Sequence, residues 1–186
     1  NGSVEQIYTK QSGDRHIPYT LKHELEKQIP IVKKRYLKYS TYNKESLEDI
    51  FGAEALSNSV VQEFNFASSA VMMNKGAGQF EIQALPRKAQ RSWMFAALVT
   101  DVNGDGIQDI IMAGNLAGVK PEAGQYDASY GEVLIGKGDG TFDYLENRNH
   151  GLKLEGDIRD LHEVEIKGQR MLMVVKNNKP LEWWRF

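Results

Sequence analysis

Cysteine is absent from the 186 residues, and this absence excludes several classes of protein at once. Without cysteine the chain has no disulfide framework, no thiolate metal site and no catalytic thiol. Long apolar runs are also missing: no stretch approaches about 18 apolar residues, so we expect no membrane-spanning helix. Excess charge of either sign is missing too, and the formal net charge of −2 argues against a dedicated nucleic-acid binder.

Recognisable catalytic motifs are missing as well. The four histidines lack metal-ligand spacing, no Gly-x-Ser-x-Gly elbow occurs, and the glycine-rich stretch 136–140 lacks the ending of a phosphate-binding loop. We expect the remaining carboxylates to be solvated or ion-paired, for instance with Arg159, although two of them could converge as in a glycosidase. The carboxylates in question are Asp127, Asp157, Asp160 and Glu163.

The densest chemistry lies in residues 101–109, Asp-Val-Asn-Gly-Asp-Gly-Ile-Gln-Asp. Side-chain oxygens at positions 1, 3, 5 and 9 and a carbonyl at position 7 have the spacing that a hard cation needs, and glycine at position 6 permits the sharp turn. Three carboxylates this close would repel one another without a cation. We predict Ca²⁺ rather than Mg²⁺, because Mg²⁺ tolerates irregular protein cages poorly. The predicted ligands are Asp101, Asn103, Asp105, the carbonyl of Ile107, and Asp109.

This loop differs from an EF-hand in two respects. Position 12 is Met112 rather than the bidentate glutamate that an EF-hand requires. The flanking stretches 95–99 and 110–112 are short apolar runs, which are typical of buried strands rather than of long helices. The sequence therefore predicts strand, cation loop, strand. The alternative is an Asn-Gly/Asp-Gly turn with solvated carboxylates.

The period of the apolar residues changes near residue 59. Before this point a four-residue spacing predicts helices over about 16–58, opening at Pro18, and after it strand-like runs begin with residues 60–66. We therefore predict a helical segment, 1–58, that packs on a sheet region, 59–186. The apolar stripe expected to make this contact comprises Leu21, Leu25, Ile29, Leu47, Ile50 and Phe51.

A hairpin pattern recurs in the sheet region. Residues 71–80 align with 133–142 and more weakly with 173–182, each with an apolar triad before a turn rich in glycine, asparagine and lysine. The second offset between the copies, 40 residues, lies in the range of about 40–50 that is typical of propeller blades, and the first, 62 residues, leaves room for the loops around 85–94 and 115–130. The alternative is that unrelated hairpins share glycine and asparagine in their turns. In the last strand Trp183 and Trp184 should point to opposite faces, so at most one of them is a core residue.

The long polar loop 115–130 is the place where we expect a ligand surface, because function tends to lie on loops held by a rigid scaffold. Its hydroxyls, amides and flat aromatic faces suit a sugar, and whichever tryptophan of the last strand lies outside the core could add a stacking surface. The alternative is a loop that packs against its own scaffold. The candidate surface residues are Tyr126, Asp127, Tyr130, Trp183 and Trp184.

The cation loop between two apolar strands resembles the calcium loop of the FG-GAP repeats of integrin α-subunit propellers and of the bacterial VCBS repeats. Other segments follow in an order that resembles the C-terminal region of large VCBS-repeat proteins of Bacteroidetes, often associated with an ASPIC/UnbV domain. These segments are Phe-Ala-Ser-Ser at 66–69, Asn-Lys-Gly at 74–76, Leu-Pro at 85–86, Ala-Gly-Asn at 113–115, and the stretches 126–131, 156–160 and 176–181.

This resemblance implies a mainly β fold with an N-terminal helical segment and about three antiparallel propeller-type blades, with structural Ca²⁺. A propeller needs about four to eight blades. We therefore expect this chain, which begins at Asn1 and has no signal peptide, to be part of a larger protein.

The implied function is a non-catalytic binding or scaffolding module of a secreted, cell-surface or periplasmic protein. Its partners would be the remainder of that protein, or a protein or glycan ligand, with a weak homodimer through an uncovered blade. The alternative is a fragment of a carbohydrate-active enzyme whose catalytic centre is completed by other blades.

Overall fold

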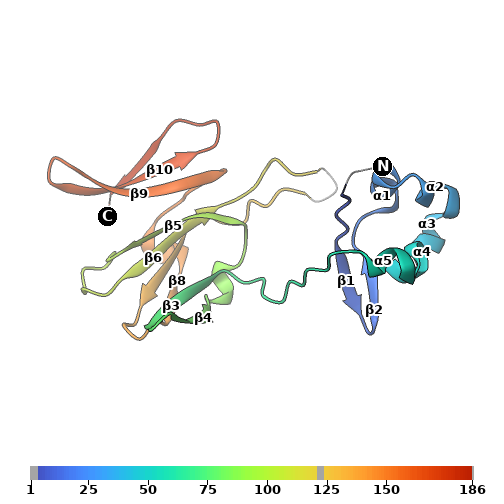
Figure 1. Cartoon of the computed structure of the whole chain (residues 1–186). Coiled ribbons are helices and arrows are strands. Elements are labelled where there is room, and N and C mark those ends of the chain that lie inside the picture. Colours follow the sequence, from blue (N-terminus) through green and yellow to red (C-terminus); the bar gives the residue numbers. More distant parts are fainter. Residues whose placement is uncertain (1–3, 121–123, 186) are drawn as a thin grey trace. The chain divides into compact units, whose positions relative to one another are not determined.

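The computed structural model describes residues 4–120 and 124–185, which belong to two compact units, Asn1–Phe64 and Asn65–Phe186 (Figure 1). The chain is mainly β, with several small antiparallel sheets and none of them closed on itself in the part described. No helix among the described residues is long and apolar enough to cross a membrane.

The first unit combines an antiparallel hairpin with short helices. The predicted helix start at Pro18 was wrong: Pro18 ends the second hairpin strand, and its extended partner strand supplies the backbone hydrogen bonds that a helix would otherwise provide. The elements are β1 (Thr9–Ser12), β2 (Arg15–Pro18), α1 (Lys22–Gln28), α2 (Ile31–Arg35), α3 (Tyr39–Tyr42), α4 (Leu47–Phe51) and α5 (Ala53–Ser57).

The first unit has a small core of its own. Leu25 and Ile50, from the stripe predicted to pack on the sheet region, are buried here, and Ile29 and Phe51 pack against them. Much of that stripe is therefore used inside the unit. Helix α4 begins at a capping box in which the Ser46 side chain and the Asp49 backbone N–H are hydrogen-bonded, and the Asp49 carboxylate accepts the Ser46 N–H in return.

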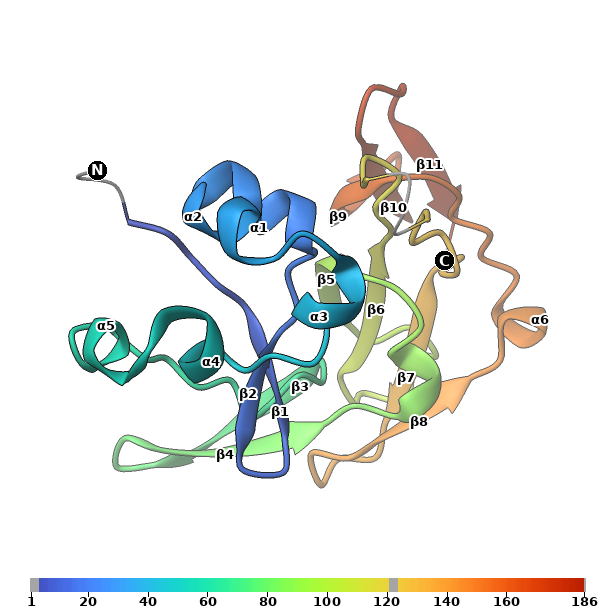
Figure 2. The same ribbon diagram turned by 90° about the vertical axis from the view of Figure 1, so that its right-hand side faces the viewer.

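The second unit contains three antiparallel sheets, each following chain order (Figure 2). The two-stranded sheet is β3 (Ala70–Gly76) with β4 (Gln79–Ala84), and the short helix η1 (Arg87–Ala89) follows it. The four-stranded sheet comprises β5 (Met94–Thr100), β6 (Asp109–Gly114), β7 (Glu132–Gly136) and β8 (Phe142–Leu145). After α6 (Asn147–His150), the three-stranded sheet comprises β9 (Ile158–Ile166), β10 (Gln169–Lys176) and β11 (Glu182–Arg185).

All three predicted hairpins form, as β3–β4, β7–β8 and β10–β11. The strands before and after the cation loop are confirmed as β5 and β6, which pair in antiparallel register. The plain hairpin predicted for the final third is β9–β10.

Strand β6 is the centre of the second unit because it is buried on both faces. Ile111 and Ala113 belong to a core shared with the three-stranded sheet, where they join Leu161 and Leu172. Alternate residues of β6 face the other way and join a second core with Leu85 and Ala89, beside the two-stranded sheet. The four-stranded sheet thus packs a core against each of its faces through β6, whose side chains alternate between the two faces.

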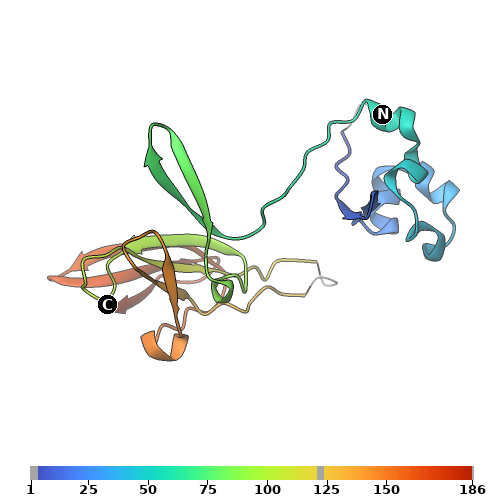
Figure 3. The same cartoon turned by 90° about the horizontal axis from the view of Figure 1, so that it is seen from below.

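The predicted strand at 60–66 was wrong. These residues are extended but pair with no strand in the described structure, because β-propensity supplies no partner for the backbone groups. The β3–β4 ribbon that follows projects from the other sheets (Figure 3). Its outer face exposes Met72, Phe80 and Ile82 by 62%, 56% and 55%.

Candidate functional site

The predicted cation loop is the connection between β5 and β6. Thr100 and Asp109 are the last register partners of the two strands, so the ends of the loop lie side by side. The eight residues between them fold back on themselves through hydrogen bonds from backbone N–H groups to side-chain oxygens. The loop is therefore shaped by the same oxygens that were predicted to bind the cation.

Asp101 organises the first half of the loop. Its Oδ1 accepts the N–H groups of Gly104 and Asp105 at 2.7 and 3.2 Å, and its Oδ2 accepts the N–H of Gly106 at 2.9 Å. Gly104 and Gly106 have φ of 79° and 82°, a left-handed conformation that favours glycine and turns these N–H groups inward. The bond from Gly106 is the main cause that holds the pKa of Asp101 below its usual value, which keeps the carboxylate ionised.

Asn103 and Asp105 lie on the same side of the loop. The Asp105 N–H that reaches Asp101 also donates to Asn103 Oδ1 at 3.0 Å, so oxygens of two predicted ligands meet at one N–H. Asn103 Nδ2 donates to Asp105 Oδ2 at 2.9 Å, and Asp105 Oδ1 accepts the Ile107 N–H at 2.7 Å. Three of the predicted ligand side chains are therefore neighbours.

Asp109 is placed differently, because it is completely buried at the base of the loop. Its Oδ2 accepts the Val102 N–H at 2.9 Å, and its Oδ1 accepts the Gly136 N–H of β7 at 2.8 Å. A Cβ at Gly136 would lie 2.2 Å from the carbonyl oxygen of Gln108, so only glycine allows this close approach. Asp109 thus joins the loop to the third strand of its sheet, a role that the sequence did not reveal.

The donor chemistry of the loop fits Ca²⁺. Two carboxylates, a side-chain amide and the nearby Ile107 carbonyl are the hard oxygen donors that this ion takes, and an oxygen that accepts one hydrogen bond keeps a further lone pair. Asp109 fits less directly, because it is completely buried and its two oxygens bond to the backbone N–H groups of Val102 and Gly136. No group of three His, Asp or Glu side chains gathers as a metal site in the described part of the chain.

Arg170 of β10 fastens the loop to the neighbouring sheet. Its Nη2 donates to the Asp101 carbonyl and to Thr100 Oγ1, both at 2.8 Å, and its Nε donates to Glu163 Oε1 at 2.7 Å. The Arg170 guanidinium, followed by the Thr100 hydroxyl, lowers the pKa of Glu163. Glu163, singled out earlier as a possible catalytic carboxylate, is therefore part of a structural ion pair.

The other carboxylates considered for catalysis are also engaged or isolated. Asp157 accepts the Ala117 N–H at 3.0 Å and pairs with Arg159 at 3.4 Å, as expected for an ion-paired residue. Asp160 lies 2.8 Å from His162 Nε2. Asp127 is exposed on its loop. The described structure brings no two of these carboxylates into contact.

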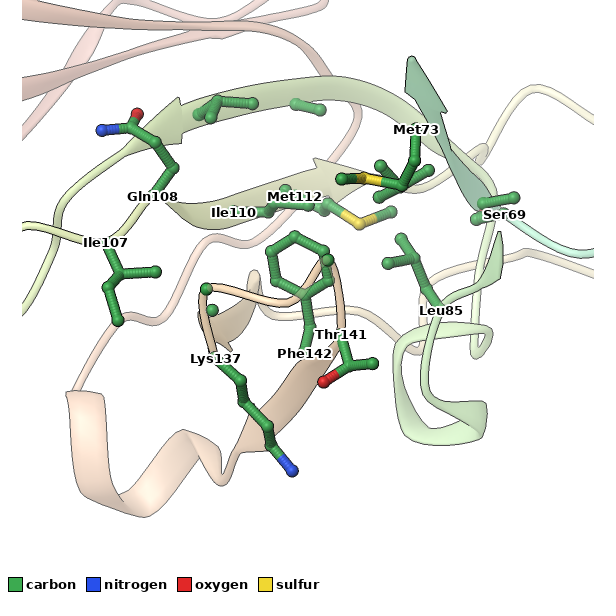
Figure 4. A pocket seen from close by; sticks show the side chains of 17 residues that line it. Ser69, Met73, Leu85, Ile107, Gln108, Ile110, Met112, Lys137, Thr141 and Phe142 are labelled. Carbon is green, nitrogen blue, oxygen red and sulfur yellow. The ribbon is translucent and has the colours of Figure 1, made fainter. Parts of the chain in front are cut away.

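An apolar groove of about 590 Å³ lies between the β3–β4 ribbon and the four-stranded sheet (Figure 4). Met73 lines it from the ribbon, Met112 and Phe142 line it from the sheet, and Ile107 brings the edge of the cation loop to it. The groove remains because a ribbon of only two strands does not cover the whole of this face of the four-stranded sheet.

The predicted ligand surface is divided between places. Trp184 packs against the core while Trp183 is exposed on β11, which is the expected opposition of the two side chains. Tyr130 and Tyr126 are both exposed on the long loop. The ring of Tyr126 contacts the ring of Trp93. The sequence does not mark Trp93 as a surface residue, because it stands alone between polar residues and a strand. Phe95 joins the same ring cluster.

Comparisons of the chain with protein-family models, with curated proteins and with solved structures found no match. The resemblance to FG-GAP and VCBS repeats therefore stays a prediction that rests on the sequence motifs.

Proposed function

We propose that this chain is a non-catalytic, calcium-stabilised binding or scaffolding module whose second unit consists of propeller-type blades. One observation carries the proposal: the side-chain oxygens of Asp101, Asn103 and Asp105 gather on a tight loop between the first two strands of a four-stranded antiparallel sheet. Ca²⁺ on this loop would neutralise its carboxylates and add its binding free energy to folding stability.

The arrangement of the sheets supports the blade assignment. A propeller blade is a sheet of four sequential antiparallel strands, and neighbouring blades cover its two faces. The β5–β8 sheet has this strand order and two covered faces, while the β3–β4 and β9–β11 sheets repeat the same connectivity with fewer strands. Such a module would belong to a larger secreted, cell-surface or periplasmic protein and would hold a protein or glycan ligand.

Calorimetric titration of the chelator-stripped full chain with Ca²⁺ tests the proposal, together with the melting temperature. We expect heat of binding and stabilisation of about 2.7 kcal/mol at a Ca²⁺ concentration 100 times the Kd. Asp105→Ala should abolish most of the binding. Asp143→Ala is the matched control, because it removes one exposed carboxylate from the same sheet without touching the loop.

The absence of both heat and a shift in melting temperature would contradict the calcium proposal. Equal loss of binding in the two variants would mean that net charge, and not the loop, attracts the ion.

A further inference from the structure

An exposed aromatic cluster lies beside the start of β5 and the long loop. The rings of Trp93 and Phe95 have centroids 6.4 Å apart with planes 25° from parallel, and the ring of Tyr126 lies 5.9 Å from Trp93 at 52°. These side chains are 55%, 43% and 39% exposed. Rings of this size dominate the energetics of interfaces, and three adjacent exposed ones form a surface suited to a ligand.

The backbone under the cluster is fixed. The Trp93 carbonyl accepts the Asn115 N–H at 2.8 Å, and a Cβ at Gly114 would lie 1.8 Å from that carbonyl oxygen, so only glycine fits opposite Trp93. Register shifts at Phe95, a bulge of the kind that re-aims a side chain. The Tyr126 backbone exchanges two hydrogen bonds with Leu116, at 2.8 and 3.0 Å.

Asn115 is the buried base of this arrangement. It is 2% exposed and has φ of 79°, an uncommon conformation for a residue other than glycine. Its amide nitrogen donates to the carbonyls of Ser129 and Gly156, and its amide oxygen accepts the Ser129 N–H. Three separate segments of the chain are thus tied together under the aromatic rings, so the rings are held before a ligand arrives.

The cluster presents polar groups at its rim. The guanidinium of Arg159 lies 4.4 Å from the centre of the Phe95 ring and anchors it. The indole N–H of Trp93 and the hydroxyl of Tyr126 have no hydrogen-bond partner within the described residues. A donor and a donor–acceptor therefore lie at the edges of the rings.

We propose that Trp93, Phe95 and Tyr126 form a platform that binds a polysaccharide chain. The C–H face of a sugar ring is apolar and packs on an aromatic face, while its hydroxyl groups can bond to the polar rim. An extended proline-rich peptide also packs on aromatic rings, but it offers carbonyl acceptors and almost no donors, so it would leave the Tyr126 hydroxyl oxygen without a donor. This inference rests on the proposed function as a binding module and names the ligand class of that module.

Affinity electrophoresis of the full chain tests this inference, in native gels that contain hydroxyethylcellulose, xylan, laminarin or polygalacturonate, with Ca²⁺ present. We expect at least one polysaccharide to retard the chain. Trp93→Ala and Tyr126→Ala should weaken that binding at least about tenfold, the effect of removing a central anchor. Circular dichroism checks that each variant is folded.

An exposed ring elsewhere serves as the matched control, because Phe80→Ala on β4 should leave retardation unchanged. Retardation by none of the four polysaccharides would overturn the inference. The inference would also be contradicted if the Trp93 and Tyr126 variants were retarded like the unmodified chain. Binding of a polyproline peptide to the platform in place of every polysaccharide would contradict it as well.

The same variants separate this inference from the calcium proposal. Trp93→Ala should keep the Ca²⁺-dependent rise in melting temperature, since its side chain is not part of the loop. Polysaccharide binding by a chain that shows no Ca²⁺ response would overturn the calcium proposal alone, and a Ca²⁺ response without polysaccharide binding would overturn the platform alone.

Discussion

Asp109 and Asp105 show how two residues of one motif can have different environments. Asp105 is exposed, and its hydrogen bonds stay within the loop. Asp109 is completely buried, and it accepts one N–H from the loop and one from β7. The first arrangement leaves a carboxylate accessible to an ion from solvent, whereas the second makes the carboxylate part of the framework.

We expect Asp109→Asn to destabilise the chain by about 1–3 kcal/mol both with and without Ca²⁺, because the new amide NH₂ would face a backbone N–H that loses its acceptor. Urea unfolding in Ca²⁺ and in chelator measures this. Asp105→Ala is the comparison, and its loss of stability should be larger in Ca²⁺ than in chelator. If Asp109→Asn were neutral in chelator, the buried carboxylate would not support the framework.

At the scale of the elements, the loop, β6 and β7 are joined by a close approach of two backbones. Gly136 faces the Gln108 carbonyl where any side chain would collide, and its N–H reaches Asp109 across the same gap. The position does not need the conformational freedom of glycine, since its φ lies outside the left-handed region. Glycine is required at position 136 only because a Cβ would collide with the Gln108 carbonyl, so the requirement comes from packing and not from backbone conformation.

We expect Gly136→Ala to lower the unfolding free energy by about 1–3 kcal/mol, as overpacking of a filled site does, and to weaken Ca²⁺ binding by displacing Asp109. Differential scanning calorimetry and calcium titration measure the two effects. Gly118→Ala is the control, because a Cβ there would meet nothing within 4 Å. If Gly136→Ala and Gly118→Ala had similar unfolding free energies and Ca²⁺ affinities, the backbones at Gly136 and Gln108 could move apart at little cost in free energy.

At the scale of the whole molecule, each unit has its own buried clusters. The first unit buries Leu25, Val32 and Ile50 together, and the second has a core on each face of the four-stranded sheet. The expectation that the helical segment also packs on the sheet region stays a prediction.

We expect a chain that lacks residues 1–58 to fold and bind Ca²⁺ but to self-associate, because the apolar outer face of the ribbon would lack any cover. Size-exclusion chromatography with light scattering measures this. Replacing Ile82 by Thr in the shortened chain, which keeps a β-branched residue on β4, should reduce the association. A monomeric shortened chain with an unchanged melting temperature would show that residues 1–58 cover nothing.

Local patterns in the sequence determined a large part of this molecule. The loop at 101–109 has its spacing of oxygens and glycines within nine residues, and each of the three hairpins has its turn between its own strands. Features of this kind follow from neighbouring residues alone, so they could be predicted. The same reasoning failed at two places because strand pairing outweighs local propensity. Pro18 lies in a strand because a partner strand is present, and residues 60–66 form no strand because no partner is present in the described structure.

Tertiary structure alone decided which of these residues share a place. Arg170 reaches Asp101 across 69 positions of the chain, Arg159 lies over Phe95, and Trp93 meets Tyr126 through the loop that Asn115 anchors. The sequence favours Tyr126 and Trp183 equally as ligand-surface residues. Only the fold shows that Tyr126 lies beside Trp93 while Trp183 lies apart on β11. Contacts between distant segments depend on how the sheets pack, and no periodicity in the sequence records that packing.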